Sequence, residues 1–180
     1  MTTSRAVAAE AAHLARLLVE RNLRIVFAES CTGGLMSEAM TRIPGISGYF
    51  CGSAVVYQVE TKAAWLGVSR EILAKPGPVS RAVAIEMARG VLDKTPAADL
   101  AVAVTGHLGP NAPKRQDGLF WFASAVRDSS VWRPDDSVVV RSHRLGSDDR
   151  CSAAQLRLRR QRAAAIYVLR SVSILLGSAD

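Results

Sequence analysis

The 180-residue chain lacks long apolar runs and contains few cysteines and few aromatic side chains. No stretch approaches the roughly 18 uninterrupted apolar residues of a membrane-spanning helix, so the sequence predicts no membrane association. The N-terminus has no basic flank before a pure apolar segment, since Glu10 and Glu20 interrupt it, and it is not typical of a signal peptide. The three cysteines, Cys31, Cys51 and Cys151, form no CxxC pair and no metal-ligand cluster. This pattern predicts no metal site and a reducing, cytoplasmic compartment.

What is present is an ordinary globular composition, with 49% apolar and 22% charged residues. No linker, internal repeat or low-complexity tract divides the chain. Because this length suits one compact domain, we predict a single domain over residues 1–180.

The net charge of +7 is concentrated near the C-terminus. Residues 141–170 contain eight arginines against two aspartates, a local surplus that nearly equals the whole net charge. Such a patch suits a polyanion, a phosphorylated small molecule or solvent alone. No recognised nucleic-acid-binding motif accompanies it, so nucleic acid is not an expected partner.

Hydrophobic periodicity predicts a mixture of helices and strands, which favours a layered α/β sandwich. Strands are expected over residues 23–28, 48–57, 99–105, 119–127 and 136–145. Helices are expected over residues 4–22, 35–42 and 60–66, after an N-cap at Ser80, and over 149–176. The run over 99–105 is apolar almost throughout, which indicates burial on both faces of that strand.

One candidate site lies where the first strand gives way to a helix, at Glu29-Ser30-Cys31-Thr32-Gly33-Gly34. Free N–H groups at a helix start favour an anion, a phosphate or the oxyanion of a tetrahedral intermediate, and glycines let a ligand approach the backbone. The same pattern is equally consistent with a simple helix cap formed by Ser30 or Thr32. A P-loop is not expected, because the GxxxxGK[ST] pattern is absent.

Further candidates lie at the next strand ends. Thr105 and Gly106 close the buried strand, and ligands collect at such carboxyl ends in open α/β sheets, although a plain turn is the alternative. Lys62 lies five residues after Tyr57. A buried lysine approaches neutrality and serves as a general base for a serine hydroxyl, whereas a surface lysine is the commoner case. His107 has a pKa suited to a base, but a lone loop histidine is more often only solvated.

A series of motifs in one order carries a family resemblance. They are Ala28–Leu35 (AESCTGGL), Pro44-Gly45, Val56-Tyr57, Lys62, Leu66-Gly67-Val68, Val79-Ser80 and Asp99–Gly106 (DLAVAVTG). With them the chain resembles the C-terminal domain of the competence/damage-inducible protein CinA, the nicotinamide-nucleotide amidohydrolase family, in its stand-alone form. The AESCTGG string is highly specific, and the resemblance covers about residues 8–145.

The resemblance implies a three-layer α/β/α sandwich with a mixed sheet, and it implies that the chain shares the family's enzymatic activity. That activity is hydrolysis of the carboxamide of nicotinamide mononucleotide to nicotinate mononucleotide and ammonia, in NAD recycling, without a cofactor or metal. By the same resemblance, Ser30 matches the nucleophile, and Tyr57 and Lys62 match the residues that activate it. The substrate-binding positions would be Thr32, Gly33, Gly34, Thr105 and Gly106. The partners implied are a phosphorylated small molecule and further copies of the chain, as a homo-oligomer.

The chain departs from the family pattern at three places. The family's TGxAGPGGG reads TGHLGPNAP over Thr105–Pro113, its Gly-Thr-Val reads Gly118-Leu119-Phe120, and its Gly-Asp-Arg reads GSDDR over Gly146–Arg150, with Ala154 where a second arginine is usual. The altered 107–113 loop has fewer glycines and more proline, so we expect weaker phosphate binding there. The later arginines are Arg157, Arg159, Arg160 and Arg162, and which of them reaches a phosphate stays open. The alternative function is a divergent member that binds a ligand or partner without turnover.

Overall fold

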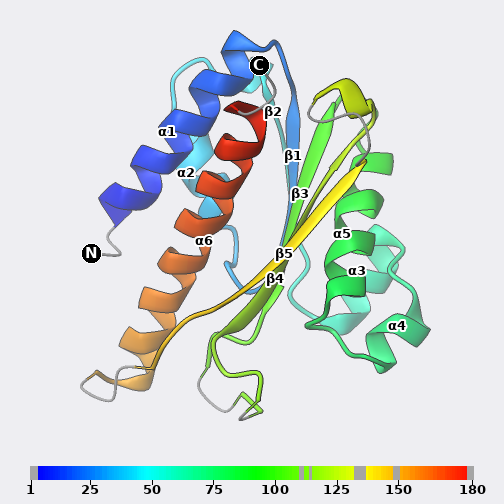
Figure 1. The fold of residues 1–180 in the computed structure, drawn as a ribbon, viewed down its shortest axis with the longest axis vertical. Helices are drawn as coiled ribbons and strands as arrows, with labels where there is room; N and C mark the ends of the chain where they lie inside the picture. The colour runs from blue at the N-terminus through cyan, green and yellow to red at the C-terminus, as the bar shows by residue number, and fades with distance from the viewer. Residues whose placement is uncertain (1–3, 110–111, 114, 132–136, 148–150, 178–180) are drawn as a thin grey trace.

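The computed structural model describes residues 4–109, 112–113, 115–131, 137–147 and 151–177. Over these residues the chain forms a five-stranded sheet with helices packed on both faces (Figure 1). The predicted α/β fold with a mixed sheet is therefore confirmed.

The sheet has the strand order β2-β1-β3-β4-β5. Its strands are β1 (Ile25–Glu29), β2 (Phe50–Val55), β3 (Leu100–Gly106), β4 (Leu119–Val126) and β5 (Val138–Arg144). Strand β1 runs parallel to both β2 and β3, whereas β4 runs antiparallel to β3 and to β5. The carboxyl ends of β1, β2 and β3 therefore meet at one edge, which is where ligands collect in open α/β sheets.

One face of the sheet is covered by α1 (Ser4–Glu20), α2 (Leu35–Thr41) and α6 (Ala153–Gly177). Side chains alternate between the faces of a strand, and the large apolar ones point to this side. The core here includes Phe27, Val102, Val104, Phe120 and Phe122 from the strands. Leu14, Leu18, Val168 and Leu169 meet them from α1 and α6. Bulky apolar side chains therefore fill the space between this face of the sheet and its helices.

The opposite face is covered by α3 (Val59–Leu66), α4 (Arg70–Ala74) and α5 (Arg81–Asp93). The strand residues that point to this side are mostly small: Ala28, Ala101, Ala103, Ala123 and Ala125. Because these side chains are short, α5 packs close to the sheet and meets it with Val83, Met87 and Val91. The expected N-cap is present, since the Ser80 hydroxyl accepts the Val83 amide at 3.3 Å.

The element bounds differ from the sequence predictions mainly at the ends. The second strand covers Phe50–Val55 rather than residues 48–57, and the short helix α4 and the 3-10 turns Ile46–Gly48 and Ser129–Val131 had no sequence prediction. Residue 136, the expected start of β5, and residue 149, the expected start of the last helix, lie outside the described residues. No helix in the described segments is long and apolar enough to cross a membrane.

Candidate active site

Ser30 lies at the carboxyl end of β1, in the centre of the parallel part of the sheet. Its backbone N–H donates to the Val104 carbonyl at 3.0 Å, which continues the pairing of β1 with β3 for one more residue. On the other side, the Val56 N–H donates to the Glu29 carbonyl at 2.8 Å and extends the pairing with β2. Ser30 is 6% exposed. The hydroxyl is therefore held by rigid backbone at the edge where the parallel strands end.

Lys62 approaches this hydroxyl from α3. Its Nζ donates to Ser30 Oγ at 2.8 Å and to the Val56 carbonyl at 2.6 Å. The lysine is 2% exposed, and burial lowers its pKa from 10.5 to about 8. With that pKa, about a tenth of the amine is neutral at pH 7, compared with a negligible part for a solvated lysine. The structure therefore brings a hydroxyl and a candidate base together out of reach of bulk solvent.

A cavity of about 230 Å³ opens above this pair. Its lining combines Ser30, Cys31 and Lys62 with the strand-end residues Thr105 and Gly106, the loop residues His107, Leu108, Gly109 and Ala112, and Tyr57 and Arg157. The loops after three strands thus converge on the hydroxyl, together with side chains from two helices, α3 and α6. A concave site with a few convergent polar groups is the usual form of a small-molecule site.

Thr105 and Gly106, at the end of β3, line the cavity, and their predicted role in substrate binding stays a prediction. The Thr105 hydroxyl donates to the Pro78 carbonyl at 2.8 Å, so it ties the β3 end to the loop before α5. At Gly106, a Cβ would lie 2.6 Å from Phe120 Cβ and 3.0 Å from Cys31 Sγ. The glycine is therefore required by packing with β4, apart from any contact with a ligand.

Tyr57 follows β2 and contributes to the mouth of the cavity rather than to its base. Its side chain is 56% exposed, and its hydroxyl accepts a hydrogen bond from Arg157 Nη2 at 2.7 Å. Among the described residues, no hydrogen bond joins Tyr57 to Ser30 or Lys62. The structure therefore unites two of the three predicted catalytic residues and places the third against an arginine.

The start of α2 binds an anion, but that anion is the carboxylate of Glu29. The Thr32 hydroxyl donates to Glu29 Oε2 at 2.8 Å, and the amides of Gly34 and Met36 donate to the same oxygen at 3.1 and 3.2 Å. The amide of Ser37 donates to Oε1 at 2.9 Å, and the Ser37 hydroxyl donates there too. Donors that the sequence analysis left free for a substrate are therefore already used, because a buried carboxylate at a helix start is stabilised by its N–H groups.

This arrangement bears on the predicted substrate-binding role of residues 32–34. Thr32, Gly33 and Gly34 do not belong to the described lining of the cavity, so their assignment as substrate-binding residues stays a prediction without support from this geometry. Glu29 has a role that the sequence analysis missed. A signal was present, because an acidic residue that ends an apolar strand directly before a helix start is expected to need donors.

Two other groups in the cavity have unusual acid–base properties. Burial raises the pKa of the Cys31 thiol to about 12, so the cysteine beside Ser30 stays protonated and is a poor nucleophile. Burial also lowers the pKa of His107, partly offset by a hydrogen bond with Gln116, so this imidazole is neutral at pH 7. Among the described lining residues, the Ser30 hydroxyl is therefore a better candidate nucleophile than the Cys31 thiol.

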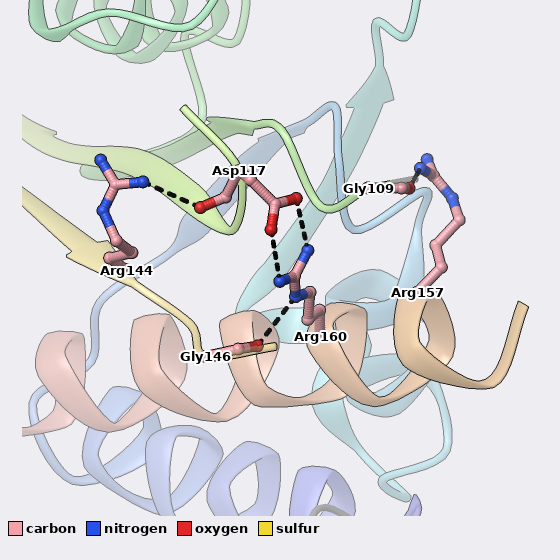
Figure 2. A network of polar contacts seen from close by, with 6 residues as sticks. All are labelled: Gly109, Asp117, Arg144, Gly146, Arg157 and Arg160. Carbon is pink, nitrogen blue, oxygen red and sulfur yellow. Dashed lines mark hydrogen bonds and ion pairs between the residues drawn. The ribbon is translucent and has the colours of Figure 1, made fainter. Parts of the chain in front are cut away.

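Arg157 is the C-terminal arginine that reaches the cavity. It lies near the start of α6, and its Nη1 donates to the Gly109 carbonyl (Figure 2). Its Nη2 donates to the Tyr57 hydroxyl. The sequence places several arginines on this helix but does not show which of them reaches the cavity. Only the tertiary contacts show that Arg157 turns toward the strand ends. Within the described residues, no three His, Cys, Asp or Glu side chains are grouped to hold a metal ion.

Comparisons with known proteins agree on one family. The family model of the CinA C-terminal domain matches residues 7–162. A CinA-like protein of Leptospira borgpetersenii serovar Hardjo-bovis (strain L550) is 43% identical over 120 residues, which are 66% of this chain and 28% of that protein. A CinA-like protein of Thermosynechococcus vestitus is 42% identical over 120 residues, 66% of this chain and 29% of that protein. The matched part thus spans less than a third of the length of these relatives.

Solved structures show the same fold. The competence damage-inducible protein A from Klebsiella pneumoniae subsp. pneumoniae MGH 78578 has a TM-score of 0.82 at 28% identity and covers 95% of this chain and 97% of its own. The competence/damage inducible protein CihA from Agrobacterium tumefaciens has a TM-score of 0.81 at 30% identity, with 94% and 95% covered. Since the family model covers most of the sequence and its fold is reproduced, the chain belongs to the CinA C-terminal domain family.

Proposed function

We propose that this chain is an amidohydrolase that converts nicotinamide mononucleotide to nicotinate mononucleotide and ammonia. The observation that carries the proposal is the 2.8 Å contact between Lys62 Nζ and Ser30 Oγ at the base of the cavity. A buried amine beside a serine hydroxyl at a strand end is an acyl-transfer arrangement, because the amine activates a nucleophile that is weak by itself. Membership of the CinA family supports a hydrolase of this class.

In the acylation step, the neutral Lys62 amine accepts the Ser30 hydroxyl proton while Oγ attacks the carboxamide carbon. The Val56 carbonyl accepts an N–H from the amine and so directs its lone pair toward Oγ. The resulting tetrahedral intermediate collapses when the Lys62 ammonium gives its proton to the departing nitrogen. The C–N bond breaks, ammonia leaves, and an ester joins the pyridine carbonyl to Ser30.

In the deacylation step, a water molecule takes the position that ammonia has left. Lys62, neutral again, accepts a proton from this water as its oxygen attacks the ester carbon. The ester C–O bond then breaks, and Ser30 Oγ recovers a proton from Lys62. The products are nicotinate mononucleotide and the free enzyme, so each turnover consumes one water molecule and leaves the lysine unchanged.

The phosphate of the substrate is assigned to Arg157. Arg157 lines the same cavity as Ser30, and among the described residues its guanidinium donates to two neutral oxygens, the Gly109 carbonyl and the Tyr57 hydroxyl. A phosphate forms stronger, charge-assisted hydrogen bonds with a guanidinium than these groups do. In this proposal Tyr57 orients Arg157 at the mouth of the cavity.

The experiment is ammonia release by the purified chain from nicotinamide mononucleotide, with nicotinamide riboside and free nicotinamide as comparison amides. We expect the mononucleotide to have the highest kcat/KM, since it alone carries the phosphate that Arg157 would bind. Arg157→Lys is the matched variant, because it keeps a cation but loses the planar fork. Binding of the mononucleotide without ammonia release would favour the alternative, a family member that binds without turnover.

A further inference from the structure

A second arginine of α6, Arg160, forms an ion pair that the proposed reaction does not use; its guanidinium is buried, and the carboxylate of its partner Asp117 is partly exposed. Its Nη1 and Nη2 donate to Asp117 Oδ1 and Oδ2 at 2.7 and 2.8 Å, and its Nε donates to the Gly146 carbonyl at 3.1 Å (Figure 2). Arg160 is 3% exposed. The guanidinium thus joins α6 to the loop between β3 and β4 and to the segment after β5.

The β3–β4 loop begins at His107 and returns to the sheet at Gly118. Its base is closed by two backbone hydrogen bonds, from the Gly118 N–H to the His107 carbonyl and from the His107 N–H to the Leu119 carbonyl, both at 2.8 Å. Arg144 of β5 adds a contact from the other side, since its Nη1 donates to the Asp117 carbonyl at 2.9 Å. Arg144 Nη2 also donates to the Arg115 carbonyl at 2.7 Å, so Asp117 is one of the points at which this loop is held against the rest of the molecule, and it is the one that Arg160 contacts.

Gly109 packs directly on the ion pair. A Cβ at this position would lie 2.9 Å from Arg160 Nη1 and 3.3 Å from Asp117 Oδ1, and the backbone has a φ of +69°, which favours glycine. The carbonyl of the same residue accepts the hydrogen bond from Arg157 Nη1. A continuous chain of contacts therefore leads from the pair through the Gly109 backbone to Arg157 and then to the Tyr57 hydroxyl.

An ion pair with a buried guanidinium is weak evidence for a role in stability, because well-packed apolar side chains of similar volume stabilise a fold as well or better. What the pair supplies is geometry, since a bidentate contact fixes both the distance and the angle between two groups. We propose that the Arg160–Asp117 pair is a positioning element for Arg157: it fixes the Gly109 carbonyl, and thereby directs the Arg157 guanidinium at the anionic group of the substrate. The kinetic part of this inference rests on the proposed function.

The kinetic test uses Arg160→Lys, which keeps the charge but loses the bidentate contact, and Asp117→Asn, whose side chain lies closer to the surface. The control is Glu10→Gln, which removes an exposed ion pair between α1 and Arg170 of the same helix. We expect both variants at the pair to raise KM for nicotinamide mononucleotide about tenfold, equivalent to about 1.4 kcal/mol, with kcat nearly unchanged. The kcat/KM for nicotinamide riboside, which has no phosphate, should not change. An equal loss for both substrates, or an unchanged KM, would overturn the inference.

A spectroscopic readout keeps the test independent of the reaction. The Arg157 guanidinium signals in ¹⁵N NMR are assigned by their absence in Arg157→Lys. In the wild type we expect separate Nη signals, because two acceptors hinder rotation of the group, and in Arg160→Lys and Asp117→Asn we expect them to merge. Glu10→Gln should leave them separate. If the wild type releases no ammonia, the proposed function fails, and the positioning role is still decided by these signals: unchanged Arg157 signals in both variants refute it.

Discussion

Lys62 shows how burial changes the acid–base properties of one side chain. A lysine amine in water is almost wholly protonated at neutral pH and cannot accept a proton from a serine. In this chain α3 places the amine in a dry position, where Ser30 and the Val56 carbonyl are its hydrogen-bond partners. Desolvation disfavours the ammonium form, and the pKa falls to about 8. The same burial opposes folding, so the lysine is kept at a cost in stability.

The pH dependence of the reaction follows from this lowered pKa. Only the neutral amine accepts the Ser30 proton, so we expect kcat/KM to rise about tenfold per pH unit below pH 8 and to level off above it. Stability should move in the same direction. The unfolded lysine binds its proton more tightly than the folded one, so burial of Lys62 lowers the free energy of unfolding at pH values below about 8. This penalty decreases as the pH rises from about 8 to 10.5. A kcat/KM that is constant or falls between pH 6 and 8 would contradict the assignment of Lys62 as base.

Glu29 is expected to stabilise the turn that carries Ser30. Its two oxygens accept from Thr32, Gly34, Met36 and Ser37, and an amide side chain at this position provides only one acceptor oxygen. We expect Glu29→Gln to lower the free energy of unfolding by about 2–3 kcal/mol, because buried donors lose a charged partner. Denaturant unfolding measures this effect. Glu38→Gln, an exposed change on α2, the helix whose start Glu29 caps, is the control, and equal effects of the two changes would argue against the role of Glu29.

At the scale of elements, the contact between α3 and α5 determines where Lys62 lies. Gly90 of α5 faces the last residue of α3, and a Cβ there would be 2.0 Å from the Leu66 carbonyl oxygen. The two helices can approach this closely only because residue 90 has no side chain. Since Lys62 lies one turn before Leu66 on α3, this close approach also sets the distance from the amine to Ser30.

Gly90→Ala is therefore expected to affect both stability and activity. The methyl group would push α3 away from α5, which we expect to cost about 1–3 kcal/mol in the free energy of unfolding. Displacement of Lys62 by a fraction of an ångström should lower kcat about tenfold or more. Gly177→Ala, at the end of α6 with open space around it, is the matched control. Unchanged unfolding and kcat in Gly90→Ala would show that this contact does not position the lysine.

At the scale of the whole molecule, the sequence predicts elements whose signal is local and continuous. Strand β3 is an unbroken apolar run, and the Ser80 cap precedes a clear helical pattern, so both appear where periodicity places them. Helix α4 was missed because five residues are too few for a periodic signal. Motif order gave the family and, with it, the expectation that Lys62 belongs with Ser30.

What could not be predicted depends on contacts between distant segments. A strand, two glycines and a helix form the same pattern whether the anion at the helix start is a ligand or Glu29, so the pattern alone does not show which of the two residues 32–34 contact. Arg157 and Arg160 are three residues apart on one helix. Arg157 lines the cavity, whereas Arg160 contacts Asp117, and this difference depends on contacts with the β3–β4 loop. In both cases tertiary contact, rather than local pattern, decides the role of the residue.

The proposal that Ser30 is the nucleophile is tested most directly by one comparison, ammonia release from nicotinamide mononucleotide by Ser30→Ala and by the wild type. We expect turnover to fall by at least about a thousandfold, because no other side chain replaces the attacking hydroxyl. The melting temperature should stay close to that of the wild type, since the backbone contacts of residue 30 remain. Ser171→Ala, which changes a similarly buried serine of α6 outside the cavity, should retain full turnover. Wild-type ammonia release by Ser30→Ala would contradict the mechanism.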